Sequence, residues 1–243
     1  MLDLIGTTVL TAAIAVNLNA AITMMPLSAA QKLTTVALAG LWIGLAIALA
    51  GAGVYAVTST PVPAIGVMAG LPVVAAGIAA LSLASVREAL LALPLPLLVG
   101  LNAMRVFGAF FLLLAAQNRL SGPFPQSAGW GDIIVGLTAI PLTIAIVRNP
   151  EGGRSALFAW NLFATLDLIA AVTLGIMSAP GSPLQIFGET IGSVAVVTLP
   201  WSNIPTLLVP FYLITHGIIF ARLARARGTL RSDDGLAAAR SGL

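Results

Sequence analysis

Charged residues are scarce in this sequence, and cysteine is absent. The 243 residues include 11 Lys or Arg and 8 Asp or Glu, so that 8% of the side chains carry a charge. A soluble domain of this length would carry roughly 60 charges at the usual share of about 25%. Since so few charges cannot cover a surface that faces water, and since 59% of the residues are hydrophobic, we predict that lipid surrounds most of the chain.

The other absences exclude several classes of function. Without cysteine the chain has no disulfide scaffold, thiolate metal site or cysteine nucleophile. One histidine, His216, is too few for a zinc site or a bis-histidine haem, and the sole lysine, Lys32, lies at a helix end where it could not hold retinal. The sequence contains no Gly-x-Ser-x-Gly motif. We therefore predict no metal, no cofactor and no catalytic residue, and we favour a protein that is not an enzyme.

Long apolar runs replace the missing charges. A helix needs about 20 apolar residues to cross roughly 30 Å of hydrocarbon, and seven runs of this kind are bounded by charge, Pro or Gly. They predict an all-α fold, a bundle of seven transmembrane helices within residues 1–230, followed by a disordered cytoplasmic tail over 231–243. The predicted spans are 4–25, 33–57, 62–84, 89–116, 130–148, 155–178 and 201–222, and 121–129 is predicted to be an outer loop.

The positive charges predict the orientation. If the C terminus is cytoplasmic, Arg119 lies in an outer loop and Arg105 lies within a span. All other cations then lie inside, which favours an N-out, C-in, multi-pass protein of the cell membrane. An eighth helix over 185–199 would move the Arg-rich tail outside, and this run contains Glu189. We therefore predict a re-entrant or interfacial segment there. The cations predicted to lie inside are Lys32, Arg87, Arg148, Arg154, Arg222, Arg225, Arg227, Arg231 and Arg240.

Two charged side chains interrupt the predicted spans. Counted from cytoplasmic edges near Pro94 and Ser155, Arg105 lies about 16 Å deep and Asp167 about 18 Å deep. A charge at this depth costs about 2.5–3.5 kcal/mol on insertion scales. Since the two residues share a level and have opposite charges, we predict that they pair inside the bundle. Such a pair could fix helix packing or could bind a transported solute.

Four further polar residues form a second predicted layer, nearer the cytoplasm. His216, Asn161, Asn102 and Asn17 come from four spans and lie about 9–12 Å from the cytoplasmic edge. Asn102 and Arg105 are three residues apart and should project from one face of their helix. Each amide could line a cavity, or could simply bond a neighbouring helix.

Asp132 opens the fifth predicted span, in the string Gly129-Trp130-Gly131-Asp132. An acid in the first turn of a helix complements the helix dipole, so Asp132 could be a cap. Alternatively, Asp132 could form the outer mouth of a polar track that runs through Arg105 and Asp167 to His216. Both interpretations place Asp132 near the outer surface.

Small residues and arginines suggest partners. Gly40 and Gly44, and likewise Gly66 and Gly70, form small-xxx-small faces that favour close packing within the bundle or a homodimer. The Arg-rich tail could bind anionic lipid. A net charge of +3 is too small for a nucleic-acid groove, so we predict no nucleic-acid partner.

Several strings in the last 140 or so residues carry a resemblance. Arg105-Val106-Phe107-Gly108, GWGD at Gly129, WN at Trp160 and LPW at Leu199, together with Asp167 and His216, resemble a group of uncharacterised bacterial seven-helix integral membrane proteins. The resemblance implies a membrane location and carries no activity.

Three classes of function remain open at this point. We favour a small transporter, or a proton-linked permeation or binding protein, for a small polar or amphiphilic solute. The alternatives are a membrane enzyme that acts on a quinone or isoprenoid, and a non-catalytic subunit or sensor. In the transporter, Arg105 would be the anion or counter-ion site, Asp167 the proton carrier and His216 a cytoplasmic relay.

Overall fold

The computed structural model describes residues 1–57, 60, 62–150, 152–188 and 190–241, and the side chains through residue 226. Seven helices in this part of the chain are long and apolar enough to cross a membrane, and it contains no strand. The predicted seven-helix, all-α fold is confirmed. Their bounds are α1 Leu2–Met24, α2 Ala29–Gly51, α3 Ala64–Ser82, a fourth span over Leu95–Ala116, α7 Phe124–Arg148, α8 Arg154–Met177, and a seventh span over Ile204–Ala226.

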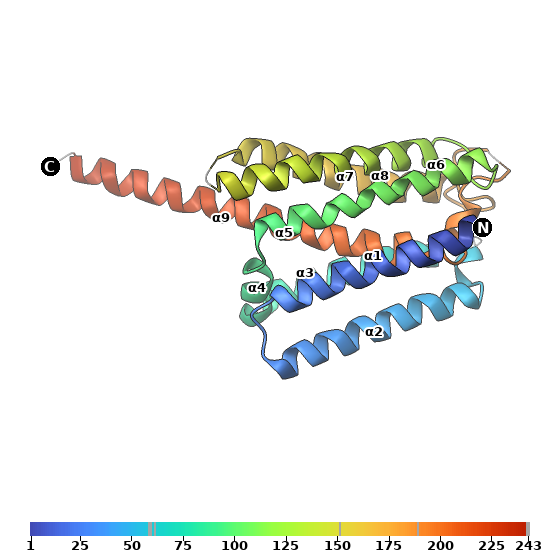
Figure 1. Ribbon diagram of the computed structural model, residues 1–243, viewed down its shortest axis with the longest axis horizontal. Helices are drawn as coiled ribbons and strands as arrows, with labels where there is room; N and C mark the ends of the chain where they lie inside the picture. Colours follow the sequence, from blue (N-terminus) through green and yellow to red (C-terminus); the bar gives the residue numbers. More distant parts are fainter. Residues whose placement is uncertain (58–59, 61, 151, 189, 242–243) are drawn as a thin grey trace.

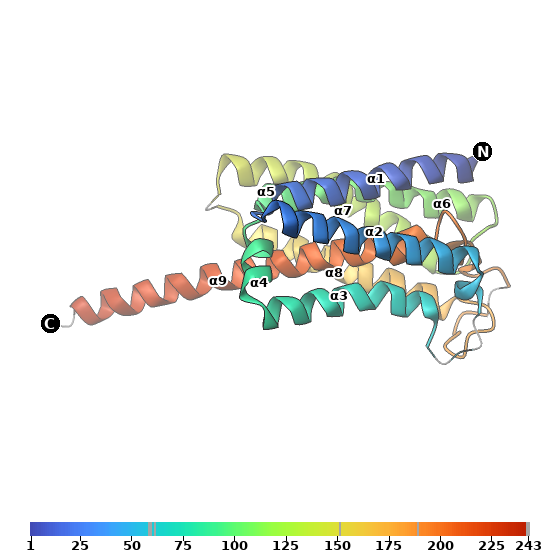
Figure 2. The same ribbon diagram turned by 90° about the horizontal axis from the view of Figure 1, so that it is seen from below.

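The helices form two groups that meet on the last span. α9 (Val209–Ser241) contacts α8 and α5 (Leu95–Gly100) on one side and α3 on the other, and Figures 1 and 2 show it running between these groups. α2 lies at the edge of the bundle, where only Ala46 is buried. The most closely packed helices are therefore those of the fourth span together with α7, α8 and α9.

Two spans are not regular α-helices. The fourth consists of α5, a 3-10 stretch η2 (Leu101–Gly108) and α6 (Ala109–Ala116). The seventh begins with a π turn, η4 (Ile204–Leu208), before α9. Pro210 has no N–H to offer the helix carbonyl of Thr206, and the indole Nε1 of Trp42 donates to that carbonyl at 3.2 Å. A neighbouring helix thus satisfies a backbone group that proline frees.

Three of the predicted spans have wrong boundaries. The second, predicted over 33–57, is α2 over Ala29–Gly51. A short helix, α4 (Ala84–Leu91), precedes the fourth span, which begins only after Pro94. α7 begins at Phe124, so most of the loop predicted over 121–129 is helical. Pro125 lies in the first turn of α7, where a proline lacks no helix hydrogen bond. The loop was predicted because a proline more often breaks a helix than begins one.

The segment predicted to be re-entrant or interfacial is not a transmembrane helix. Its described residues are irregular apart from a 3-10 turn, η3 (Val194–Val197), and Glu189 lies outside the described residues. Backbone bonds tie it to the end of α8, for example Ser193 N–H to Ser178 O at 3.2 Å. The absence of an eighth helix in the described part of this segment agrees with the prediction.

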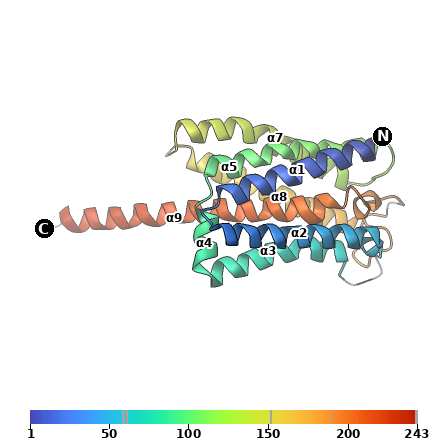
Figure 3. The same cartoon turned by 60° about the horizontal axis from the view of Figure 1, so that its bottom comes forward.

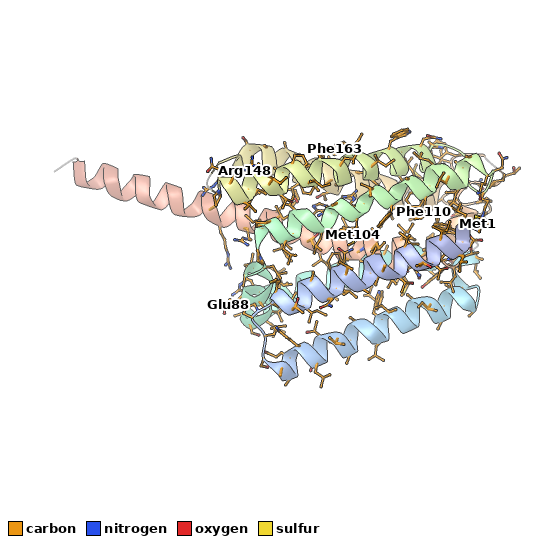
Figure 4. All side chains as sticks on the ribbon, viewed as in Figure 1. Met1, Glu88, Met104, Phe110, Arg148 and Phe163 are labelled. Carbon is orange, nitrogen blue, oxygen red and sulfur yellow. The ribbon has the colours of Figure 1, made fainter. Side chains whose placement is uncertain are left out.

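The end of the bundle from which α9 extends carries several arginines, among them Arg87 on α4, Arg225 on α9 and Arg148. α4 crosses the end from which α9 extends (Figure 3), and Figure 4 shows Glu88 and Arg148 at this end and Met1 at the other. At the Met1 end, the Asp3 carboxylate accepts bonds from Arg119 and from the buried Trp201 indole, each at 2.7 Å. α9 continues as a helix to Ser241, beyond the position where the tail is predicted to begin.

Candidate functional site

Arg105 lies on the 3-10 stretch of the fourth span. A 3-10 helix has three residues per turn, so side chains three apart eclipse one another. Asn102, Arg105 and Gly108 consequently share one buried face of η2, as predicted for the first two. A 3-10 run of eight residues is uncommon and often marks a functional segment. Figure 4 shows Met104, next to Arg105 in sequence, between the two ends of the bundle.

Glycines let α7 approach η2 and α6 closely. A Cβ built on Gly136 would lie 2.6 Å from the backbone N of Val106, and one on Gly129 would lie 2.7 Å from Leu112 Cγ. Such small-residue faces let helix backbones meet in a membrane. By contrast, nothing lies within 4 Å of a Cβ at Gly40 or Gly44. The prediction that these two glycines pack within the bundle is therefore wrong, and their role in a homodimer stays a prediction.

The second predicted glycine pair makes one contact. A Cβ at Gly66 would lie 3.4 Å from Ile176 Cδ1 of α8, whereas nothing lies within 4 Å at Gly70. The pair does not form a continuous packing face.

Arg105 binds two carboxylates. Its Nε donates to Asp132 Oδ1 at 2.7 Å and its Nη2 donates to Asp167 Oδ2 at 2.5 Å. The side chain of Arg105 is 1% exposed, that of Asp167 7% and that of Asp132 13%. The predicted pair of Arg105 and Asp167 is confirmed, and we refer to Arg105, Asp132 and Asp167 as the ion cluster.

Asp132 is not a helix cap near the surface. It is the ninth residue of α7, which begins at Phe124, and it contacts the same guanidinium as Asp167. With both carboxylates ionised, one positive and two negative charges give the ion cluster a formal charge of −1. The predicted pair of Arg105 and Asp167 is therefore only part of the site, because Asp132 adds a second negative charge.

Two glycines make room for the carboxylates. A Cβ at Gly131 would overlap the carboxylate of Asp167, and a Cβ at Gly108 would lie 2.7 Å from Asp132 Oδ2. Neither glycine was predicted to belong to the site. The only sequence signal was their place in the strings Arg105-Val106-Phe107-Gly108 and Gly131-Asp132.

His216 contacts the ion cluster instead of forming a separate layer. Its Nε2 lies 3.3 Å from Arg105 Nη1, and its Nδ1 lies 2.8 Å from Asn161 Oδ1. Asn161 Nδ2 also donates to the His216 carbonyl at 3.2 Å. Because an arginine nitrogen can only donate, His216 Nε2 accepts and Nδ1 carries the proton. Asn161 thereby fixes the tautomer of His216.

The remaining two predicted amides differ in their contacts. Asn17 Nδ2 donates to the Tyr212 hydroxyl at 3.1 Å, and the Tyr212 ring lies 5.8 Å from the guanidinium carbon of Arg105. Asn17 thus reaches the ion cluster through Tyr212, a residue that was not predicted to belong to the site. Asn102 donates to Leu98 O of its own span. The Oδ1 atoms of both amides are buried without a hydrogen-bond partner in the described part of the chain.

Two cavities meet the ion cluster at Asp132. The first is about 70 Å³, lies between α3, α7, α8 and η4, and has an apolar wall that includes Phe111 and Leu168. The second is about 30 Å³, and its otherwise apolar wall includes Arg105, Asp132 and Tyr212. A water molecule needs about 10–15 Å³ of cavity volume, so the second cavity has room for about two water molecules. Asp132 therefore lines two mainly apolar cavities, and the wall of the second also includes Arg105 and Tyr212.

The single histidine allows a direct test of this geometry. In protein labelled with ¹⁵N-histidine, we expect one protonated and one unprotonated ring nitrogen, with the proton on Nδ1. Arg105→Gln should shift the Nε2 resonance, because its donor is lost, whereas Arg119→Gln should not, because Arg119 pairs with Asp3 at the bundle end. Protons on both ring nitrogens at neutral pH would contradict the assignment.

Seven apolar helices around a buried group of charged side chains define a multi-pass integral membrane protein. The chain belongs to the family described as "Domain of unknown function (DUF8737)", whose family model matches residues 62–224. The match includes the whole ion cluster and His216, and it leaves out α1 and α2. No curated protein and no solved structure matches the chain.

Proposed function

We propose that this protein is a small proton-linked transporter or binding protein for a small polar or amphiphilic solute. It would lie in the cell membrane with its N terminus outside and its Arg-rich end inside. One observation carries the proposal: Arg105 faces two buried carboxylates, and one of them, Asp132, lines both cavities.

The charge count favours a bound proton. An unpaired charge deep in a membrane costs several kcal/mol, so a site with one excess carboxylate is stabilised when it takes up a proton. Asp132 and Asp167 both contact Arg105, and we propose that they share this proton. Any solute that brings or removes charge beside Asp132 would change the affinity for the proton, which is the linkage a coupled carrier needs.

The size and lining of the first cavity favour a small solute with an apolar part. A cavity of about 70 Å³ with an apolar wall suits a short aliphatic or aromatic group. Asp132, which lines this cavity, would bind the polar end of the same molecule. His216 would hold the guanidinium, since its Nε2 faces an arginine N–H, and the proton would stay on the carboxylates.

Infrared spectroscopy tests the shared proton. At neutral pH we expect one carbonyl stretch from a protonated, buried carboxylic acid in the wild type. Asp132→Asn and Asp167→Asn should each abolish it, because the remaining carboxylate then balances Arg105. Glu88→Gln, which removes an exposed acid on α4, should leave it unchanged. A wild type without this band would overturn the proposed proton site.

Proton flux tests the transport role. Vesicles that contain the purified protein and a pH-sensitive dye should acidify under an imposed negative-inside potential faster than protein-free vesicles. Asp132→Asn should abolish the difference. A wild-type rate equal to that of protein-free vesicles would contradict proton-linked permeation.

The apolar wall of the first cavity also favours a second candidate, a membrane enzyme for a lipid-soluble substrate. A quinone or isoprenoid would place its polar head at Asp132 and its tail along Phe111 and Leu168. Native mass spectrometry of the purified protein distinguishes the two, since a retained quinone or isoprenoid would favour the enzyme.

A further inference from the structure

A groove larger than both cavities lies at the end of the bundle from which α9 extends. It is formed by α3, α4 and α9 and has a volume of about 360 Å³, which is within the range of small-molecule sites. Two glycines open it, because nothing lies within 4 Å of a Cβ at Gly77 on α3 or at Gly217 on α9. The rest of the wall is apolar except for two arginines.

These two arginines, Arg87 and Arg225, come from different helices. Arg87 lies on α4, where its Nη1 makes a long bond of 3.5 Å to Ala80 O, and Arg225 is exposed on α9. No acidic residue among the described ones lines the groove. Glu88 follows Arg87 on α4 but is exposed and not part of the wall. The groove therefore combines an apolar wall with a charge of +2.

The position of the groove suits a lipid. Figures 2 and 3 show the short helix α4 lying across the end of the bundle beside α3 and α9. The long side chains of arginines near a span end reach the headgroup region. Basic pockets between transmembrane helices on the cytoplasmic side bind lipid headgroups, and the positive charges predict that this end is cytoplasmic.

We infer that this groove binds an anionic phospholipid. One acyl chain lies along Gly77 and Gly217, and the phosphate lies between Arg87 and Arg225. The apolar wall requires the acyl chain, which a free phosphate lacks, and the two arginines select a headgroup with net negative charge. The inference depends on neither the ion cluster nor the proposed transport.

Native mass spectrometry with added lipid tests the inference. The full-length protein, stripped of lipid in a neutral detergent, is titrated with phosphatidylglycerol and with phosphatidylcholine of the same acyl chains. We expect the wild type to retain phosphatidylglycerol preferentially. Arg87→Gln combined with Arg225→Gln should weaken that binding about 30-fold, and each single change should weaken it by less.

Two further variants test whether the lipid binds in the groove itself. Arg148→Gln removes an exposed arginine at the same end (Figure 4) that does not line the groove, and it should leave the binding unchanged. Gly77→Leu fills the groove and should weaken the binding of both lipids. Equal retention of the two lipids by the wild type, or an equal loss in Arg148→Gln, would overturn the inference. A dimer that dissociates in Gly77→Leu would assign the groove to a second copy instead.

Discussion

Arg105→Gln should lower the free energy of unfolding by about 3–5 kcal/mol, because it leaves two buried carboxylates without their counter-ion. The guanidinium bonds Asp132, Asp167, the Ala164 carbonyl and His216 Nε2. A glutamine can replace only part of this set, and it brings no charge. Equilibrium unfolding in mixed micelles with sodium dodecyl sulfate, followed by tryptophan fluorescence, measures the loss.

A matched arginine provides the control. Arg119 also pairs with an aspartate at 2.7 Å, but its side chain is 32% exposed and that of Asp3 is 54% exposed. Exposed ion pairs contribute about 0–1 kcal/mol, so Arg119→Gln should cost no more than that. A similar loss for both arginines would show that burial of the ion cluster is not what stabilises the bundle.

Removing the whole ion cluster should restore stability. Arg105→Gln combined with Asp132→Asn and Asp167→Asn leaves polar groups of similar size and no charge. Replacing a buried ionic group as a unit is often neutral, whereas breaking it is costly. We expect the triple variant to unfold with a free energy within about 1–2 kcal/mol of the wild type and to lose the infrared band and the proton flux. A triple variant less stable than Arg105→Gln would contradict this electrostatic explanation.

The spans could be predicted because each depends on the average hydrophobicity of about 20 residues. The boundary of a span depends on only one or two residues, and it is therefore harder to predict. Pro94 and Pro125 show the difference. Pro94 is the N-cap residue directly before the fourth span, and Pro125 lies inside the first turn of α7. In the first turn of a helix a proline costs no hydrogen bond, whereas in the interior, as at Pro141 of α7, it leaves a carbonyl without its helix partner. Composition alone does not distinguish these two settings.

The pair of Arg105 and Asp167 could be predicted because opposite charges at equal depth need one another in lipid. Asp132 was misplaced for the same reason that the start of α7 was wrong, since its depth was counted from the wrong end residue. The depth of His216 was counted from Arg222, although α9 continues past it. Depth estimates therefore depend on the true ends of the helices.

Gly108 and Gly131 could not be predicted, because the sequence does not specify how a helix is rotated about its axis. It therefore does not show which glycines of the helix face a neighbouring helix. The sequence shows small-xxx-small spacing at Gly40 and Gly44, yet nothing packs there. The close approach occurs instead on α7, at Gly129 and Gly136. Gly108 and Gly131 lie against the two carboxylates that Arg105 binds, at the faces where η2, α7 and α8 meet.

Gly131→Ala is expected to destabilise the protein by about 1–3 kcal/mol, as overpacking in a buried site does. This sign is unusual, since replacing a glycine inside a helix with alanine normally stabilises it by roughly 0.5–1 kcal/mol. The added methyl group would occupy the position of the Asp167 carboxylate. Either the carboxylate must leave Arg105, or α7 must move away from α8, and both changes break the ion cluster.

A control glycine and a second change isolate the cause. Gly44→Ala, on the exposed face of α2 with nothing within 4 Å of the new Cβ, should keep or raise stability. Asp167→Ala removes the atoms that the methyl group meets, so adding Gly131→Ala to it should cost far less than in the wild type. Equilibrium unfolding of the four proteins in this cycle gives the coupling energy, and a coupling near zero would show that Gly131 is not needed to seat the Asp167 carboxylate. A large coupling together with loss of the infrared band in Gly131→Ala would link the packing of α7 to the protonation of the site. The absence of a side chain at Gly131 would then be needed both for close helix packing and for the bound proton.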